Sequence, residues 1–461
     1  MAWNYMLMLS VLCWLPFTLA LPNRISARAT GGPPIRSHST SAIHTSFTGT
    51  PTVVGALNAT SVGSGISSLG VAPGATTYPS DGKLHQPQPA PFVPGGGLGT
   101  NGTTPVYNAK SDFDYESLSL ALYQEWIELD LFHDGLARFS EADFAAAGLT
   151  AEDRYLIQFM AEQELGHATM LSNILGAEAP AQCTYNYPYT TVPEFLDFCQ
   201  KLTRFGEAGV YGFLPHLNSR EAAILLTQSI TTEARQQMVF RQFEGLFPMP
   251  VWFEVGVPQS WAWTLLAPHI SYCPENQTRL AWQNFPALKI LNQPNPARVN
   301  GERANNETLT ASGGMNVLKS SNVTGSAACV NSTTVGESCH PGVTRNRTAP
   351  LSFPGRRVSL QWESPGQPVG PNNSYITATT AGTPKYVLWA SQLNVTYSPL
   401  MGGGNNSGMT IQPNISTYQG DPAVNGTVFI AITDDNVFVT PFNISMVNPH
   451  IVAGPALYQA G

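Results

Sequence analysis

The chain has 461 residues, with 22 Lys plus Arg against 30 Asp plus Glu, which gives a formal net charge of -8. No basic run occurs anywhere in it, so nucleic acid and anionic membrane surfaces are not expected as partners. After the first twenty residues no segment offers roughly 18 uninterrupted apolar residues, so no membrane span is predicted.

The N-terminal segment has the pattern of a secretory signal peptide. Residues 1–20, MAWNYMLMLSVLCWLPFTLA, form an apolar run that ends in small residues, and Arg24 and Arg28 follow in a polar stretch. We therefore expect a signal peptide over 1–20 and a protein that is secreted, extracellular or associated with the cell wall. Residues 21–108 are dominated by Gly, Ser, Thr, Pro and Ala. That composition cannot bury enough apolar surface to fold alone and predicts a low-complexity linker.

Acceptor sequons for N-glycans lie on both sides of the segment 102–275 and are absent within it. Glycans need exposed backbone, so this gap predicts a compact segment free of glycans between flanks that carry them. The sequons begin at Asn58, Asn101, Asn276, Asn306, Asn322, Asn331, Asn346, Asn372, Asn394, Asn405, Asn414, Asn425 and Asn443.

Outside the predicted signal peptide the chain keeps an odd number of cysteines, so at least one has no intrachain partner. In an oxidising compartment we would pair Cys329 with Cys339, across a short loop, and Cys183 with Cys273, although the sequence does not determine the connectivity. Cys199 is then left unpaired inside a helix.

Residues 109–290 show the apolar spacing of long helices and predict a helical bundle. The first helix is expected over 112–138, with Ser140 and Asp143 in a connecting segment. The second begins after Thr150, which is a suitable N-cap, and stops at Gly176. The third follows Pro193 and runs to about 212.

The fourth helix begins near Asn218 or Ser219 and must end by Phe247, because Pro248 and Pro250 cannot continue it. The aromatic segment that follows, PQSWAWTLLAPHISYC, is expected to cover one end of the bundle.

The remaining chain has two different compositions. Residues 291–350 are polar and dense in sequons, which predicts a disordered glycosylated insertion. Residues 351–461 alternate as strands do in RRVSLQWES, KYVLWASQLNVTY and GTVFIAITDDNVFVTPF, which predicts a small β-rich C-terminal module. The predicted fold is therefore mainly α, a four-helix bundle with disordered glycosylated flanks and this β-rich module.

In three of the predicted helices a glutamate interrupts the apolar stripe: Glu125, Glu164 and Glu233. Alternating steps of three and four residues trace one face of a helix. A buried carboxylate costs several kcal/mol unless it is paired or neutralised, and a shared divalent metal would supply the compensation. The stripes are Leu118, Leu122, Glu125, Leu129, Phe132 and Leu136; Ile157, Met160, Glu164, His167, Leu171 and Ile174; and Leu226, Ser229, Glu233, Gln236, Phe240, Phe243 and Phe247.

Glu164 and His167 have the i, i+3 spacing with which a helix presents two metal ligands to one interior point. Glu125 and Glu164 lie about equally far from residue 145, so an antiparallel hairpin brings them level. The competing interpretation is a buried histidine bonded to a backbone carbonyl, since Glu-x-x-His alone is a weak motif. Glu128, one turn from Glu125, is interpreted as a solvated neighbour.

The second half of the candidate site is less complete. Gln236 stands three residues after Glu233, where a histidine would ligate, and its amide can coordinate poorly or simply hydrogen-bond a ligand. Glu207 in the third helix points off the apolar stripe and is expected to be solvated. Arg204 and Arg235 offer an alternative in which ion pairs neutralise the acids without any metal.

Four stretches, LALYQEWIELDLFHDGLARFSEADF, FMAEQELGHATML, LTRFGEAGVYGFLPHL and SITTEARQQMVFR, resemble the ferritin-like superfamily. The similarity is closer to the fungal secreted stress-response proteins of the Rds type, which carry a ferritin-like domain. The resemblance implies Glu125, Glu164 and His167 as ligands of one half-site of a di-metal centre and Glu233 as a ligand of the other. Gln236 departs from the histidine of the family pattern, and the third-helix glutamate is absent or displaced to Glu207.

Three functions follow as hypotheses. The first is a secreted or cell-surface glycoprotein associated with stress response, with a partial or degraded di-metal site and either no metal or bound iron or manganese. The second is an iron- or manganese-dependent enzyme that handles oxygen or peroxide. The third is metal sequestration without catalysis.

Overall fold

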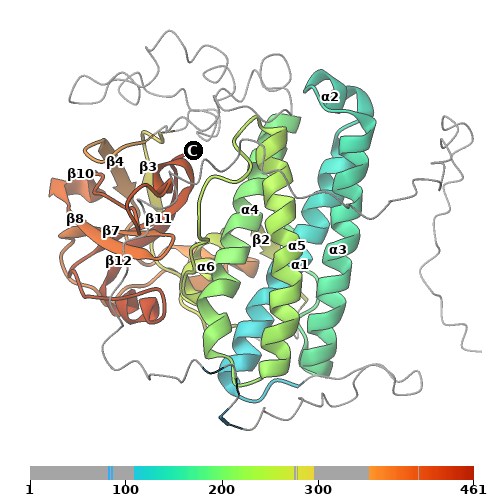
Figure 1. Cartoon of the computed structure of the whole chain (residues 1–461), viewed down its shortest axis with the longest axis horizontal. Coiled ribbons are helices and arrows are strands. Elements are labelled where there is room, and N and C mark those ends of the chain that lie inside the picture. The colour runs from blue at the N-terminus through green and yellow to red at the C-terminus, as the bar shows by residue number, and fades with distance from the viewer. Residues whose placement is uncertain are drawn as a thin grey trace, which may run out of the picture. The chain divides into compact units, whose positions relative to one another are not determined.

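The computed structural model describes residues 81, 83, 85, 86, 108–274, 277, 279–294, 352–402 and 404–461. The predicted signal peptide, almost all of the linker and of the 291–350 insertion, and the predicted Cys329–Cys339 disulfide lie outside these residues. Within them, several helices are followed by a β-rich C-terminal region (Figure 1). No helix in the described part of the chain is both long and apolar enough to cross a membrane.

Four long helices lie side by side (Figure 1). They are α1 (Asp112–Arg138), α3 (Ala151–Leu175), α4 (Val192–Phe213) and α5 (Arg220–Phe243). Each begins after a Ser or Thr whose side chain accepts a hydrogen bond from a backbone N–H of the first turn, which fixes where the helix starts. The predicted helices are confirmed, with Thr150 as the N-cap of α3.

The segment between α1 and α3 was predicted as a connection, and this prediction was wrong in part. Ser140 and Asp143 form a reciprocal capping box that starts a short helix, α2 (Glu141–Ala146). The ring of Phe144 is buried and meets Phe195 of α4 edge-on, with centroids 6.4 Å apart. Six residues are too few to show a helical period, so only the capping box signals this helix in the sequence.

The aromatic segment after α5 forms α6 (Gln259–Leu266), which packs along the side of α4 and α1 rather than over one end of the helices. Its approach to α4 is close, because a Cβ added at Gly209 would lie 2.8 Å from the Cβ of Ala262. The ring of Trp263 lies 5.6 Å from that of Tyr123 in α1. Trp263 and Tyr123 are thus both buried where α6 packs along the side of α1.

The Cys183–Cys273 disulfide is present, with its cysteines 90 residues apart. It lies beside the pairing of β1 (Thr184–Tyr185) with β2 (Ile270–Tyr272), so it joins the segment before α4 to the segment after α6. Cys199 is a free and buried cysteine within α4. Both predictions are confirmed.

The β-rich region contains two four-stranded antiparallel sheets. One has the order β3 (Leu288–Ile290), β4 (Arg357–Trp362), β10 (Ser407–Ile411), β9 (Met401–Gly402), and the other has the order β12 (Ile451–Gln459), β11 (Thr427–Thr433), β7 (Tyr386–Ser391), β8 (Asn394–Pro399). A short hairpin pairs β5 (Pro368–Val369) with β6 (Tyr375–Ile376). The β region is therefore larger than the predicted small module. Residues 288–290, which the sequence assigned to the helical segment, form β3. The third predicted strand, in GTVFIAITDDNVFVTPF, ends at Thr433.

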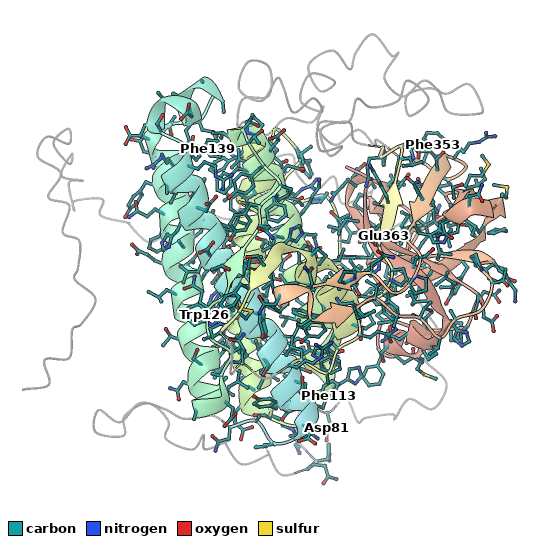
Figure 2. All side chains as sticks on the ribbon, turned by 180° about the vertical axis from the view of Figure 1, so that it is seen from behind. Asp81, Phe113, Trp126, Phe139, Phe353 and Glu363 are labelled. Carbon is teal, nitrogen blue, oxygen red and sulfur yellow. A yellow bond between two sulfur atoms is a disulfide. The ribbon has the colours of Figure 1, made fainter. Side chains whose placement is uncertain are left out.

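Strand β11 is buried on both faces, and this joins the β region to the helices. Side chains alternate along a strand, so Phe429 and Ala431 enter the core cluster that also holds residues of α1, α4 and α6. Val428, Ile430 and Ile432 point the other way, into a core shared by the two sheets. Figure 2 shows the side chains that fill these spaces.

Replacing both disulfide cysteines, Cys183→Ala/Cys273→Ala, should lower the free energy of unfolding by about 2–5 kcal/mol, because the cross-link restricts the unfolded chain. Denaturant titration under non-reducing conditions measures this loss. Cys199→Ala is the control, since it removes a buried sulfur atom that is not cross-linked. A loss in the double variant no larger than in the control would contradict the prediction.

Candidate metal centre

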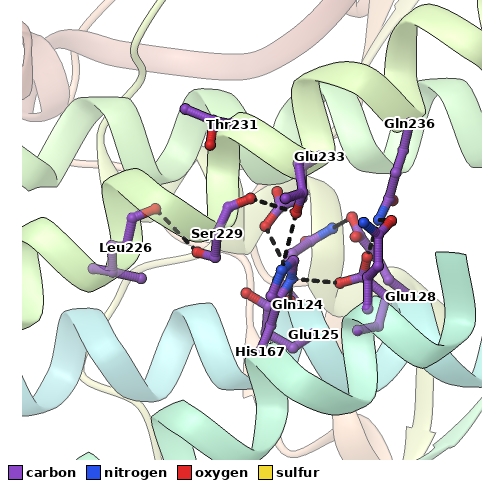
Figure 3. Close-up of polar contacts among 12 residues, drawn as sticks. Gln124, Glu125, Glu128, His167, Leu226, Ser229, Thr231, Glu233 and Gln236 are labelled. Carbon is purple, nitrogen blue, oxygen red and sulfur yellow. Dashed lines mark hydrogen bonds and ion pairs between the residues drawn. The ribbon is translucent and has the colours of Figure 1, made fainter. Parts of the chain in front are cut away.

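Four side chains from three helices converge in the core: Glu125 of α1, Glu164 and His167 of α3, and Glu233 of α5. Figure 3 labels Glu125, His167 and Glu233 among them. One ligand atom of each lies within 4.8 Å of the others. The Nδ1 atom of His167 is 3.1 Å from Oε2 of both Glu125 and Glu164, and 3.7 Å from Oε1 of Glu233. The structure therefore brings Glu125 and Glu164 level, as the hairpin argument predicts.

The helices close this cluster off from solvent. The side chains of Glu125, Glu164 and Glu233 are 0–3% exposed, whereas that of His167 is 12% exposed. Apolar residues of the predicted stripes, such as Leu122 and Leu171, are fully buried around it. Three acids thus occupy an apolar interior, where their negative charges need compensation.

Thr232, which the sequence did not single out, orients the histidine. Its hydroxyl donates to the carbonyl oxygen of Ser229 at 2.7 Å and lies 3.0 Å from Nε2 of His167. Because the hydroxyl proton is used, Thr232 accepts a hydrogen bond from Nε2–H, and this leaves Nδ1 facing the carboxylates. The only sequence signal is the position of Thr232 directly before Glu233.

The cluster retains protons when no cation is present. Burial raises the pKa of Glu125 and Glu233 well above the ordinary value, and neighbouring glutamates raise it further. For His167, burial lowers the pKa, but the hydrogen bond to Glu164 and the charges of Glu164, Glu233 and Glu128 outweigh it and bring the pKa to about 9.

Gln236 hydrogen-bonds a candidate ligand. Its Nε2 donates to Oε1 of Glu164, and also to Oε1 of Gln163 at 3.2 Å. This is the second of the two roles open to it from the sequence, and its role as a metal ligand stays a prediction. Its own Oε1 is buried and has no hydrogen-bond partner among the described residues.

The prediction that Glu128 is solvated was wrong, since it is fully buried. Helix α4 crosses α1 on this side: a Cβ added at Gly206 would lie 2.6 Å from Nε2 of Gln124. That same Nε2 donates to Oε1 of Glu128 at 2.7 Å. Burial, followed by the charge of Glu164, raises the pKa of Glu128 well above its ordinary value. Because α1 packs against both α3 and α4, it buries more than one stripe.

The prediction for Glu207 was wrong for a similar reason. It is fully buried, and Oε2 lies 3.0 Å from Nη1 of Arg204, which also pairs with Glu254. Burial raises the pKa of Glu207 to about 8, against the lowering effect of Arg204. The ion pairing proposed for Arg204 is thus present at Glu207, whereas Arg235 is exposed.

The residues present fit a divalent cation. Carboxylate oxygens and an imidazole nitrogen are donors that suit iron and manganese, and bundle proteins assemble such sites from facing helices. Oε2 of Glu128 is also buried without a hydrogen-bond partner among the described residues. A cation would relieve the repulsion between these acids. The cluster is compatible with a metal site, and its donor set does not distinguish iron from manganese.

Comparison with known proteins agrees with this geometry. The model of the ferritin-like domain matches residues 113–246, which include all four converging side chains. Protein rds1 of Schizosaccharomyces pombe is 50% identical over 387 residues, which cover 83% of this chain and 90% of that protein. The chain belongs to the Rds1 family.

The similarity to rds1 extends well beyond the ferritin-like domain, because 387 aligned residues exceed the span of the domain match. At least part of the β-rich region is therefore included in the similarity between this Rds1-family chain and its relative. The resemblance to the Rds type that the four helical stretches indicate is confirmed.

The metal-free protein should lose stability as the pH rises. Glu125 and Glu233 have folded pKa values above the ordinary 4.5, so their contribution is lost as the pH rises above about 4.5. The contribution of His167 is complete below pH 6.5 and is lost as the pH rises through about 9. For each proton that the folded state binds beyond those bound by the unfolded state, the free energy of unfolding falls by about 1.4 kcal/mol per pH unit.

Denaturant titrations with a chelator, between about pH 5 and pH 8, measure this slope. Glu233→Gln removes one of the titrating groups and should flatten it, whereas Glu162→Gln, at an exposed position of α3, should not. A stability of the metal-free protein that increases across this range would contradict the prediction.

Proposed function

We propose that this chain is a secreted Rds1-family glycoprotein, associated with stress response, that binds iron or manganese in its helical core. The four long helices act as a ferritin-like four-helix bundle, and Glu125, Glu164, His167 and Glu233 hold the metal. The observation that carries the proposal is the convergence of these ligand atoms within 4.8 Å in a buried, acidic site.

The site is proposed to hold one metal ion, as a partial form of a di-metal centre. Gln236 donates a hydrogen bond to Glu164 at the position where the family pattern has a histidine. Glu207, the carboxylate available from α4, already faces the guanidinium of Arg204. A fixed positive charge beside Glu207 disfavours a second cation there.

Secretion and glycosylation are supported by separate features. The apolar residues 1–20 have the signal pattern, and the Cys183–Cys273 disulfide suits an oxidising compartment. Among the sequons in the described β region, Asn372, Asn405 and Asn414 are exposed, as glycan attachment requires.

A second candidate is redox chemistry on oxygen or peroxide, and the partial exposure of His167 favours it. That side chain is 12% exposed, whereas those of the carboxylates around it are 0–3% exposed, so the imidazole is the part of the site nearest to solvent. A bound redox metal would supply the electron transfer. Peroxide turnover by metal-loaded protein supports this candidate, whereas stable binding without turnover supports sequestration.

The double variant Glu164→Gln/His167→Gln should lose bound iron or manganese while it retains its fold, because both changes keep side-chain volume and remove ligands. Mass spectrometry of the secreted protein, expressed with both metals supplied, measures the metal content. Glu162→Gln on the same helix is the matched control and should match wild type. Equal metal content in wild type and the double variant, or none in well-folded wild type, would refute the site.

Metal titration of the chelated wild-type protein should saturate near one equivalent per chain, since the fixed positive charge of Arg204 beside Glu207 disfavours a second cation there. Calorimetry, with elemental analysis after dialysis, measures the ratio. Saturation near two equivalents would show that the second half-site is functional and would contradict the partial site.

A further inference from the structure

A cavity of about 600 Å³ lies between the segment that follows α6 and the β5–β6 hairpin, and none of its lining residues belongs to the metal centre. Its volume falls within the range of small-molecule sites, roughly 300–1,000 Å³. Thr264, Asn284 and Phe285 are buried and form its floor, whereas Asn186, Glu363 and Gln367 are exposed and line its mouth. Figure 2 labels Glu363 among the strands.

Asn284 on the floor is held in place but has an unused acceptor. Its side chain is only 3% exposed, and Nδ2 donates to the carbonyl oxygen of Trp263 at 3.0 Å. Exchanging the amide atoms would set two oxygens against each other, so this contact fixes the orientation. Oδ1 is then a buried acceptor with no hydrogen-bond partner among the described residues. A buried unsatisfied acceptor is destabilising, and a donor in the cavity would relieve this cost.

The neighbouring backbone supports this position. The carbonyl oxygen of Asn284 accepts from the backbone N–H of Ala378 at 2.9 Å, and the backbone N–H of Phe285 donates to Oγ1 of Thr264 at 3.0 Å. Segments from both sides of the cavity thus hold its floor rigid. A rigid floor presents its acceptor in a fixed direction, which favours binding of a ligand over collapse of the cavity.

The lining excludes charged ligands as the main class. None of the described residues that line the cavity is Lys, Arg or His, so a phosphate or carboxylate would find no cation in the lining. A single exposed carboxylate, that of Glu363, is too little to retain a cation in water. Amides, hydroxyls, one carboxylate and the Phe285 ring together suit a neutral molecule that is rich in hydroxyl donors.

We propose that this cavity binds a neutral sugar unit. A sugar hydroxyl donates to Oδ1 of Asn284, and the polar groups of Glu363 and Gln367 bind further hydroxyls at the mouth. Two sources would supply the same chemistry: a carbohydrate from outside, or a glycan carried by the chain itself. The sequon at Asn372 lies beside Asn373, which lines the cavity, so a glycan there starts at the mouth. The proposal does not depend on the metal site.

The test uses the full secreted glycoprotein and a panel of neutral disaccharides of glucose, mannose or N-acetylglucosamine, with glucose 6-phosphate as the anionic comparison. Saturation-transfer NMR detects binding and calorimetry gives Kd. We expect a neutral sugar to bind and the phosphorylated one to bind at least about tenfold more weakly, because its charge is not compensated.

Variants assign the binding to this cavity. Glu363→Ala/Gln367→Ala changes exposed side chains and should raise Kd at least about tenfold, the loss expected when hydrogen-bond partners are removed. Gln361→Ala, at an exposed position of β4 outside the lining, is the matched control. Asn284→Leu should abolish sugar binding, provided that thermal unfolding shows the variant to be folded. If that variant does not fold, the exposed double variant Glu363→Ala/Gln367→Ala still tests the proposal.

Ser374→Ala distinguishes the two sources, because it removes the sequon and leaves Asn372 at its positive φ of 54°. Equal sugar binding by wild type and Ser374→Ala indicates an external sugar. Binding only by Ser374→Ala indicates that the chain's own glycan occupies the cavity, and the mouth variants are then made in that background. No binding by either protein, or unchanged binding in the Glu363→Ala/Gln367→Ala variant, overturns the proposal.

Discussion

The burial of acidic side chains inside the helical core is the constraint on which the rest of the structure depends. Glu125, Glu164 and Glu233 share one histidine, while Glu128 and Glu207 lie on neighbouring faces with one main polar partner each. Each charge would be costly in an apolar interior unless a partner, a proton or a metal compensates it. The helices can pack closely around these acids only where such compensation is available.

This constraint explains how the later segments pack on the helices. Arg204 meets Glu207 and, from the segment before α6, Glu254. Next to this group Val257 donates from its backbone N–H to Ala208 at 2.8 Å, and Gly212 leaves room for the Val257 carbonyl. Helix α6 then packs on this side of α4, and strand β12 packs on α6. The segment before α6 therefore adds Glu254 to the charged group and a backbone hydrogen bond to α4, while the β-rich region packs against α6.

The sequence predicted the features that depend on local signals. The start of α3 follows from Thr150, the prolines after α5 set a limit on where that helix can end, and the four converging candidate ligands follow from apolar spacing within single helices. Glu128 and Glu207 were misjudged because their burial depends on which segments cover each face of α1 and α4. A one-helix stripe contains no such information. The position of α6 and the addition of β3 to a sheet likewise depend on contacts between residues far apart in the sequence.

The distribution of positive charge favours the proposed binding of one cation in this core. Arg204 places a permanent positive charge beside Glu207, which disfavours a cation at that acid. Glu128 receives a neutral amide hydrogen bond from Gln124, and its raised pKa favours the protonated form. The acids that remain surround His167, whose Nδ1 faces them while Thr232 holds Nε2. One divalent ion bound there would replace protons that burial otherwise retains. Gln236 donates a hydrogen bond to Glu164 without adding a positive charge. A neutral side chain at this position fits the arrangement better than a second cationic side chain would.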